Sequence, residues 1–468
     1  MLAASFTKWD YTMISMILRS CATVALAVCA SFVLSAAEPE WKVGLASVKV
    51  TPDKPLLLSG YANRTKPYES VAADIYCKAI VLEDRDGHLA AIVTSDLLGF
   101  PADVAEPICM RIEQKIGLKR SQILLNSSHS HAGPQLTLKA PAKNGSGEAL
   151  RNVEYTRQLQ DKVVDLVCSA AEKLEPASLS WGTGVINFAM NRREFTPNGV
   201  ILGVNPRGLA DRSVPLLRID GADGKLRAVL FGTAVHGTTL TGDNYQLCGD
   251  FAGYAQAALQ ERMPSVQAFY MLGCAGDDNP YPRGTMALAI KHGQNLADEV
   301  VRILETKLRP VHGPLTIAFD YAELPLQTGF SRADLEKIAA NRRDSRNFAA
   351  TQMLAILSRG EKLPDTYRCP FAVWQLGQDL TLVGLPGEVV VDYVTMLEKA
   401  LGPNQLWIAA YCNDVFGYLP SARVLSEGGY ETRGLYSGSA GLFDPKSEQV
   451  VVQTVRELAK KAGRKLPE

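Results

Sequence analysis

The segment that decides the fold runs from residue 123 to residue 134 and reads ILLNSSHSHAGP. A short apolar run opens there into a cluster of polar residues, and four further segments repeat this pattern. They read AVLFGTAVHGTTL (228–240), FYMLGCAGDDNP (269–280), LTLVGLPGE (380–388) and LWIAAYCNDVFGY (406–418). Short apolar runs bounded by turn residues are typical of buried strands. We therefore expect five buried strands that each end in polar or acidic residues.

Several residues at these strand ends can bind a metal or transfer a proton. Ligand sites in sheets covered by helices usually lie at strand ends. Three of the six histidines of the chain fall in these clusters, and this distribution favours a metal-dependent hydrolase. The residues are His129, His131, His236, Asp277, Asp278, Glu388, Asn413, Asp414 and Tyr418.

Length and composition indicate a folded chain without a strong charge bias. The chain has 468 residues, of which 47% are hydrophobic and 21% charged, enough to bury one or two full cores. Basic and acidic residues both number 49, so no overall field attracts nucleic acid or an anionic membrane. We therefore expect a small-molecule or lipid substrate and no nucleic-acid partner.

The N-terminus has the pattern of an export signal. Lys8 and Arg19 precede the apolar run CATVALAVCASFVLSAA (21–37), which is short for a membrane span and ends in small residues. Residues 1–37 are therefore predicted to be a signal peptide, with translation beginning at Met13 or Met16. The mature protein is then exported, periplasmic or secreted, and has no transmembrane segment after cleavage.

The cysteines do not form a recognisable metal motif. Seven remain after the predicted signal peptide, widely spaced and without a CxxC pair, so a thiolate zinc site has no support. Cys274 and Cys412 lie within the clusters, where a small buried cysteine is an ordinary core residue.

Strands and helices mix along the chain, which predicts an α/β fold with mixed β-sheets covered by helices. Hairpins are expected at 76–96, with a turn at Asp86-Gly87, and at 215–237 and 370–385. Apolar spacing near three or four predicts the helices, and the stretch 331–360 is interpreted as a helical insertion. The expected helices span residues 101–116, 151–174, 251–262, 284–308, 331–358 and 446–462.

Five motifs in order resemble the neutral ceramidases, zinc amidases that hydrolyse the N-acyl bond of ceramide. NSSHSHAGP is similar to their His-x-His-x-Gly-Pro segment, and MNRREF (190–195) to their Asn-Arg-Ser-Pro segment. AVHGTTLTGDNYQLCGDFAGYA (234–255), LPGE and NDVFGYLPSARVLSEGGYE (413–431) follow in the family's order. The resemblance covers residues 44–460 and implies a single large catalytic domain over residues 38–468.

The resemblance implies a zinc site and its surroundings. His129, His236, Glu388 and Tyr418 match the family's ligands, and two imidazoles with a carboxylate leave room for water or substrate. His131 is an alternative ligand to His129, and is otherwise expected near the zinc or the oxyanion. Arg192 and Tyr430 are expected to contact the substrate, while Arg192 is equally interpretable as a buried ion-pair partner.

The chain departs from the family where the nucleophile is expected. A serine follows Gly-Asp-Val in the family, and here the segment is GDDNPY (276–281), with Asn279 in place of the serine. Because an amide side chain is not a nucleophile, we expect direct attack by zinc-activated water, with Asp277 or Asp278 as a candidate base. The alternatives are a zinc protein that binds a ligand without turnover and a metal hydrolase of another bond class.

A second departure lies at the C-terminus. The family carries an immunoglobulin-like domain after its catalytic part, whereas this chain closes with SEQVVVQTVRELAKKAG (447–463), predicted to be an amphipathic helix. We therefore expect no C-terminal immunoglobulin-like domain and a substrate smaller or more soluble than ceramide. The sequence leaves the oligomeric state open.

Overall fold

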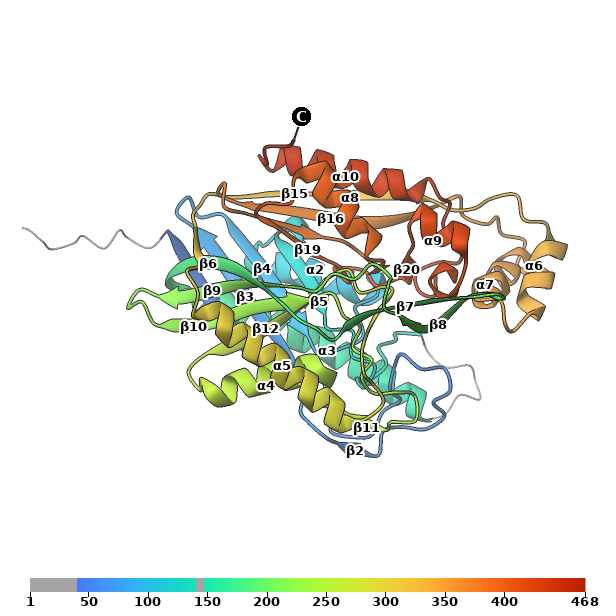
Figure 1. The fold of residues 1–468 in the computed structure, drawn as a ribbon, viewed down its shortest axis with the longest axis horizontal. Helices are drawn as coiled ribbons and strands as arrows, with labels where there is room; N and C mark the ends of the chain where they lie inside the picture. The colour runs from blue at the N-terminus through green and yellow to red at the C-terminus, as the bar shows by residue number, and fades with distance from the viewer. Residues whose placement is uncertain (1–39, 140–146, 468) are drawn as a thin grey trace, which may run out of the picture. The chain divides into compact units, whose positions relative to one another are not determined.

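A computed structural model describes residues 40–139 and 147–467, which form one compact unit of two packed β-sheets with helices on their outer faces (Figure 1). The predicted signal peptide, residues 1–37, lies outside the described residues. The larger sheet has the order β12 (Gln267–Leu272), β10 (Leu226–Thr233), β9 (Ser213–Gly221), β6 (Glu175–Val185), β1 (Trp41–Lys49), β3 (Tyr76–Asp84), β4 (Leu89–Ser95) and β5 (Ile123–Ser127), with β14 (Arg309–Val311) beside β6.

The second sheet and three small pairings complete the β-structure. The second sheet has the order β15 (Leu315–Pro325), β16 (Thr366–Leu376), β17 (Leu380–Gly384) and β19 (Leu406–Ala409). The small pairings are β13 (Asp278–Pro280) with β7 (Ala189–Thr196) and β8 (Gly199–Asn205), β18 (Glu388–Val389) with β20 (Tyr418–Leu419), and β2 (Ser70–Val71) with β11 (Gln246–Leu247). The five strands expected from the sequence are β5, β10, β12, β17 and β19.

Successive side chains of a strand point to opposite faces of its sheet, and this alternation explains the layers. In β3, Ile80 and Leu82 point into the core between the two sheets, whereas Ala79 and Val81 face α2 (Ala102–Ile116) and α3 (Gly147–Ala171). On the same outer face, α4 (Asp250–Arg262) and α5 (Met286–Leu304) pack near β10 and β12. The outer face of the second sheet is covered by α8 (Asp392–Leu401) and α10 (Ser447–Lys461). The α/β fold with mixed, helix-covered sheets is thus confirmed.

The helix predictions are correct for five segments and wrong in detail for the sixth. The helix expected over 331–358 is two helices, α6 (Arg332–Ala340) and α7 (Asn347–Ser358), because the backbone turns extended at Asn341. These two helices have a small apolar core of their own around Leu335 and Met353. Two further helices, α8 and α9 (Ala422–Glu427), were not predicted from the sequence. Within the described ranges, no helix is long and apolar enough to cross a membrane.

Asn126 joins the two ends of the larger sheet. Its Oδ1 accepts a hydrogen bond of 2.9 Å from Leu272 N, and its Nδ2 donates to Leu272 O at 3.2 Å and to Ala410 O at 2.7 Å. The fully buried amide therefore links the C-terminal ends of β5, β12 and β19. The polar segments that follow these three strands are consequently brought to one place.

Candidate metal centre

His129, His236 and Glu388 meet at the strand ends. His129 Nε2 and His236 Nε2 each lie 3.1 Å from Glu388 Oε2, and the three side chains are at most 4% exposed. His236 Nε2 and Glu388 Oε2 are nevertheless without a hydrogen bond in the part of the chain that the structure describes. Buried polar atoms without partners are costly, so atoms that converge in this way fit an electropositive ion placed between them.

The other nitrogen of each imidazole is held by the backbone. His129 Nδ1 lies 2.6 Å from Leu98 O, and His236 Nδ1 lies 2.7 Å from Ala275 O. A carbonyl oxygen can only accept, so both Nδ1 atoms carry the hydrogen and both Nε2 lone pairs are free. This arrangement is the one that metal-binding histidines usually show.

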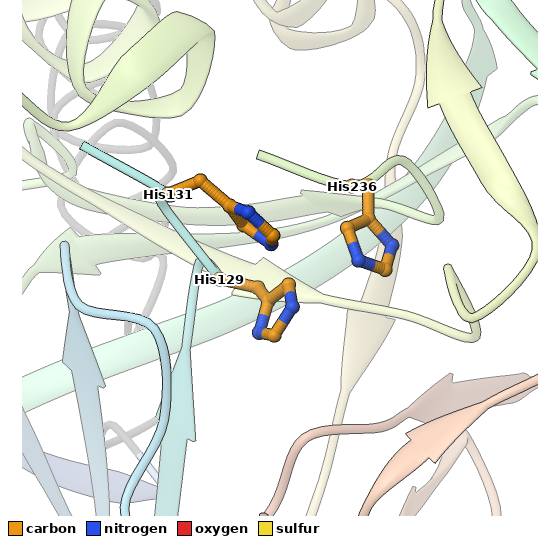
Figure 2. Close-up of side chains that lie close together, drawn as sticks. All are labelled: His129, His131 and His236. Carbon is orange, nitrogen blue, oxygen red and sulfur yellow. The ribbon is translucent and has the colours of Figure 1, made fainter. Parts of the chain in front are cut away.

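His131 belongs to the same cluster. The imidazoles of His129, His131 and His236 point toward one another, and one ring nitrogen of each lies within 4.8 Å of the others (Figure 2). Neither nitrogen of His131 has a hydrogen-bond partner among residues 40–139 and 147–467. Gly60 permits this position of the ring, because a Cβ there would lie 2.2 Å from His131 Nδ1. This geometry is compatible with both predicted roles of His131, as a ligand or as a neighbour of the metal.

Short strands place Glu388 beside Tyr418. The two residues are direct partners in the parallel pairing of β18 with β20. Gly387 has a φ of +75°, and a Cβ there would lie 2.7 Å from Cζ of Phe416, so this turn requires glycine. The other oxygen of the carboxylate, Oε1, accepts a hydrogen bond of 2.8 Å from the hydroxyl of Tyr436. Tyr436 thus fixes the orientation of Glu388, a role that the sequence analysis missed.

Electrostatics keeps the cluster in a form that binds cations. Burial, with Arg192 and His129 nearby, lowers the pKa of His236 to about 3. Burial and the two neighbouring histidines lower the pKa of His131 well below its usual value. Burial alone would raise the pKa of Glu388, but His129 and His236 outweigh it and hold that pKa well below the usual range. At neutral pH His131 and His236 are therefore neutral while Glu388 is ionised.

Arg192 connects Tyr418 to Asn279 and is also a buried ion-pair partner. Its Nη2 donates to the Tyr418 hydroxyl at 3.0 Å, its Nη1 to Asn279 Oδ1 at 3.4 Å and its Nε to Glu431 Oε1 at 2.9 Å. Asn279 Oδ1 also accepts a hydrogen bond of 3.0 Å from the hydroxyl of Thr238. The oxygen of Asn279 is thus used within the protein, and its Nδ2 donors have no acceptor in the described residues.

The two aspartates before Asn279 have other surroundings. Asp277 accepts hydrogen bonds from Val391 N at 2.7 Å and Asn191 Nδ2 at 3.2 Å, and burial raises its pKa to about 6. Both carboxyl oxygens of Asp278 are buried without a described partner, and burial raises its pKa well above the usual value. Neither residue lines the cavity at the histidine cluster. Both residues adjoin Asn279 in the sequence, but this proximity did not reveal that they lie outside the lining of the cavity.

A cavity of about 580 Å³ opens at the cluster. His129, His131 and Glu388 lie at its surface together with Tyr418 and Tyr430, as expected for a substrate site. The ring of Tyr430 packs edge-on against that of Tyr418, with the centroids 5.6 Å apart. Three of the four predicted metal ligands thus share one cavity with Tyr430, whereas His236 and Arg192 do not line it.

The backbone is strained around the cluster. Three residues without the freedom of glycine have positive φ values: His129 at 56°, Tyr411 at 54° and Asn413 at 67°. Asn413 is held there by two hydrogen bonds with the backbone of Leu125. Such conformations cost roughly 1–3 kcal/mol each and collect at functional sites.

Comparisons with known proteins identify the family and the fold of this chain. The sequence profile described as neutral/alkaline non-lysosomal ceramidase, N-terminal, matches residues 41–324. The chain belongs to this family. Neutral ceramidase B of Dictyostelium discoideum is 24% identical over 277 residues, which cover 54% of this chain and 37% of that protein. Neutral ceramidase of Pseudomonas aeruginosa is 23% identical over 248 residues, which cover 51% of this chain and 37% of that protein.

The fold is shared over more of the chain than the sequence matches. The crystal structure of the Pseudomonas aeruginosa neutral ceramidase superposes with a TM-score of 0.70 at 18% identity, over 91% of this chain and 75% of that one. A structure described as ceramidase complexed with C2 gives a TM-score of 0.67 at 17% identity, over 92% of this chain and 78% of that one. The sequence match with the curated relatives spans little more than a third of their length. The predicted family and fold are confirmed.

Proposed function

We propose that this chain is an exported, zinc-dependent hydrolase that cleaves an N-acyl amide, ceramide-like, or a related acyl bond. The observation that carries the proposal is the convergence of His129, His236 and Glu388 at a cavity, with orphaned metal-binding atoms and backbone-held Nδ1 atoms. Family membership supports the acyl-amide substrate. The basic and apolar pattern of residues 1–37 supports export.

His129, His236 and Glu388 would hold the metal, with Tyr418 as the fourth ligand. A bound zinc ion supplies Lewis-acid chemistry, since it polarises a carbonyl oxygen and lowers the pKa of water. Arg192 orients the hydroxyl of Tyr418 through the 3.0 Å hydrogen bond. His131, a neutral imidazole in the cavity, can accept a proton at one nitrogen and donate a hydrogen bond from the other. The geometry favours His131 over Asp277 and Asp278 for proton transfer.

Asn279 has a positioning role in this proposal. Its Oδ1 accepts hydrogen bonds from Thr238 and Arg192, so it helps to hold the guanidinium that donates to Tyr418, although Asn279 itself does not line the cavity. The amide side chain of Asn279 cannot form an acyl intermediate. The proposed hydrolysis therefore proceeds by direct attack of water, without a covalent acyl-enzyme.

Metal content tests the site itself. Purified wild-type protein is expected to retain about one zinc per chain, and His236→Ala should lose most of it because one imidazole ligand is removed. Elemental analysis by mass spectrometry measures the ratio, and His312→Ala, which changes an exposed histidine paired with Asp379, is the matched control. Stoichiometric zinc in His236→Ala rejects the ligand assignment. Retained zinc without turnover of any acyl amide or ester favours the alternative of a non-catalytic binding protein.

Substitutions of Asn279 test the mechanism. Asn279→Ala is expected to lower kcat by about 10-fold, because the acceptor that helps to position Arg192 is lost while the metal ligands remain. Asn279→Ser should create or raise activity on an N-acyl sphingosine if the rest of the cavity accepts ceramide.

Mass spectrometry after rapid quenching should find no acyl adduct on residues 276–281 of the wild-type protein. A trapped adduct there contradicts direct attack by water.

A further inference from the structure

Arg433 is an unpaired cation in the wall of the metal cavity. It is partly buried, and no carboxylate of residues 40–139 or 147–467 forms an ion pair with it. Nearby arginines differ, because Arg192 and Arg193 both pair with Glu431, at 2.9 and 2.5 Å. The guanidinium of Arg433 faces the cavity and is not fully buried, so an anionic ligand can reach it.

Two aromatic rings hold the guanidinium of Arg433 in place. Its Cζ lies 4.8 Å from the ring centroid of Tyr430 and 5.9 Å from that of Tyr436. Nη1 donates to the Tyr430 hydroxyl, whereas Nε and Nη2 have no acceptor within the described residues. The edge formed by Nε and Nη2 is the fork that binds a carboxylate through two parallel hydrogen bonds. Arg433 is therefore preorganised and has this edge unused.

Of the other three cations of the cavity, Lys139 is exposed, and the remaining two already have partners. Arg64 donates from Nη1 and Nη2 to the backbone oxygens of Ser59, His131 and Thr241, and its Nε is buried, whereas Lys66 pairs with Glu69. Glu388 is the acidic side chain closest to the cluster, and its oxygens face the two histidines and Tyr436. Four basic side chains and two acidic ones line the cavity in total, so its field favours an anion.

We propose that Arg433 binds a carboxylate on the amine half of the substrate, so that the preferred substrates are N-acyl amino acids rather than neutral acyl amides. Tyr436 contacts Glu388 and lies under Arg433, and the carboxylate site is therefore one aromatic ring away from the metal cluster. An N-acyl amino acid has its carboxylate close to the amide bond, which suits two neighbouring sites. The inference rests on the proposed hydrolase function for the scissile amide and on Arg433 alone for the anion.

Matched substrates test the inference. N-hexanoylglycine and N-hexanoylethanolamine share the acyl chain and differ in a carboxylate against a hydroxyl. Zinc-loaded full-length protein is expected to show a kcat/KM about 10- to 100-fold higher for the glycine conjugate. Arg433→Met should reduce that ratio to about 1–2 by lowering only the glycine value, since the charge is lost and the apolar stem is kept. Arg359→Met, which removes an exposed cation that pairs with Glu361 outside the cavity, is the control and should leave the ratio unchanged.

Binding separates this inference from the proposed reaction. Calorimetry with the hydrolysis-resistant analogues N-hexylsulfonylglycine and N-hexylsulfonylethanolamine should show the same preference in the wild type and its loss in Arg433→Met. Equal binding of the two analogues, no binding of either, or a preference that survives in Arg433→Met overturns the carboxylate site. Selective binding without hydrolysis leaves the carboxylate site standing and refutes the hydrolase. Hydrolysis of both amides at equal rates does the reverse.

Discussion

Glu388→Gln is expected to lower acyl-amide hydrolysis by at least about 10³-fold, equivalent to roughly 4 kcal/mol of transition-state stabilisation. The carboxylate is 3% exposed, and its Oε2 lies 3.1 Å from Nε2 of both His129 and His236. The isosteric amide removes the negative charge from this ligand set, so zinc binding is expected to fall as well. Initial rates on an acyl-amide panel, with zinc measured in the same samples, give both quantities.

Tyr436→Phe is expected to lower hydrolysis and zinc binding less than Glu388→Gln does. This variant keeps the carboxylate and removes the 2.8 Å hydrogen bond that orients it. Loss of such a partner typically costs about 10- to 100-fold in metal affinity or activity, so this variant should fall between wild type and Glu388→Gln. If Glu388→Gln retains more than a tenth of the wild-type rate, the catalytic metal centre lies elsewhere in the chain.

The strand-end positions of His129, His236 and Glu388 could be predicted because each residue follows an apolar run along the chain. His129 follows β5 by two residues, His236 follows β10 by three, and Glu388 follows β17 by four. The strand pattern therefore predicts that these residues lie at strand ends. It does not show that the two ends of the larger sheet meet, which depends on the long-range hydrogen bonds of Asn126.

The residues that were missed lie in a segment without periodic apolar residues, SEGGYETRGLYSGSAG (426–441). Tyr436 reaches Glu388 because its backbone N donates to Phe416 O at 2.9 Å and Leu435 bridges to Gly417. Arg433 reaches the cavity through the same docking of the loop. Such contacts connect loops without a repeating pattern, so the sequence gives no local signal for them. For the helix expected over 331–358, spacing indicated helical residues and did not reveal the break at Asn341.

Glu431→Gln is expected to destabilise the protein by about 3–5 kcal/mol, because it leaves two buried guanidiniums without their shared counter-charge. Glu431 Oε1 lies 2.9 Å from Arg192 Nε and Oε2 lies 2.5 Å from Arg193 Nη1, and the side chains of all three residues are at most 4% exposed. Chemical denaturation followed by circular dichroism measures the free energy of unfolding. Activity should also fall in the folded protein, since Arg192 holds Tyr418 and Asn279.

Glu427→Gln is the matched control for this prediction. Glu427 pairs with Arg193 at 2.9 Å and with Arg423 at 2.8 Å, but its side chain is 21% exposed, so water can replace the lost charge. Its expected cost is about 1 kcal/mol or less, with little change in turnover. If both variants lower the free energy of unfolding equally, burial of the Arg192–Glu431–Arg193 group does not determine how much this group stabilises the protein. A stable but inactive Glu431→Gln would instead assign Glu431 to the orientation of Arg192, because the fold would tolerate the lost charge while Tyr418 and Asn279 lose their support.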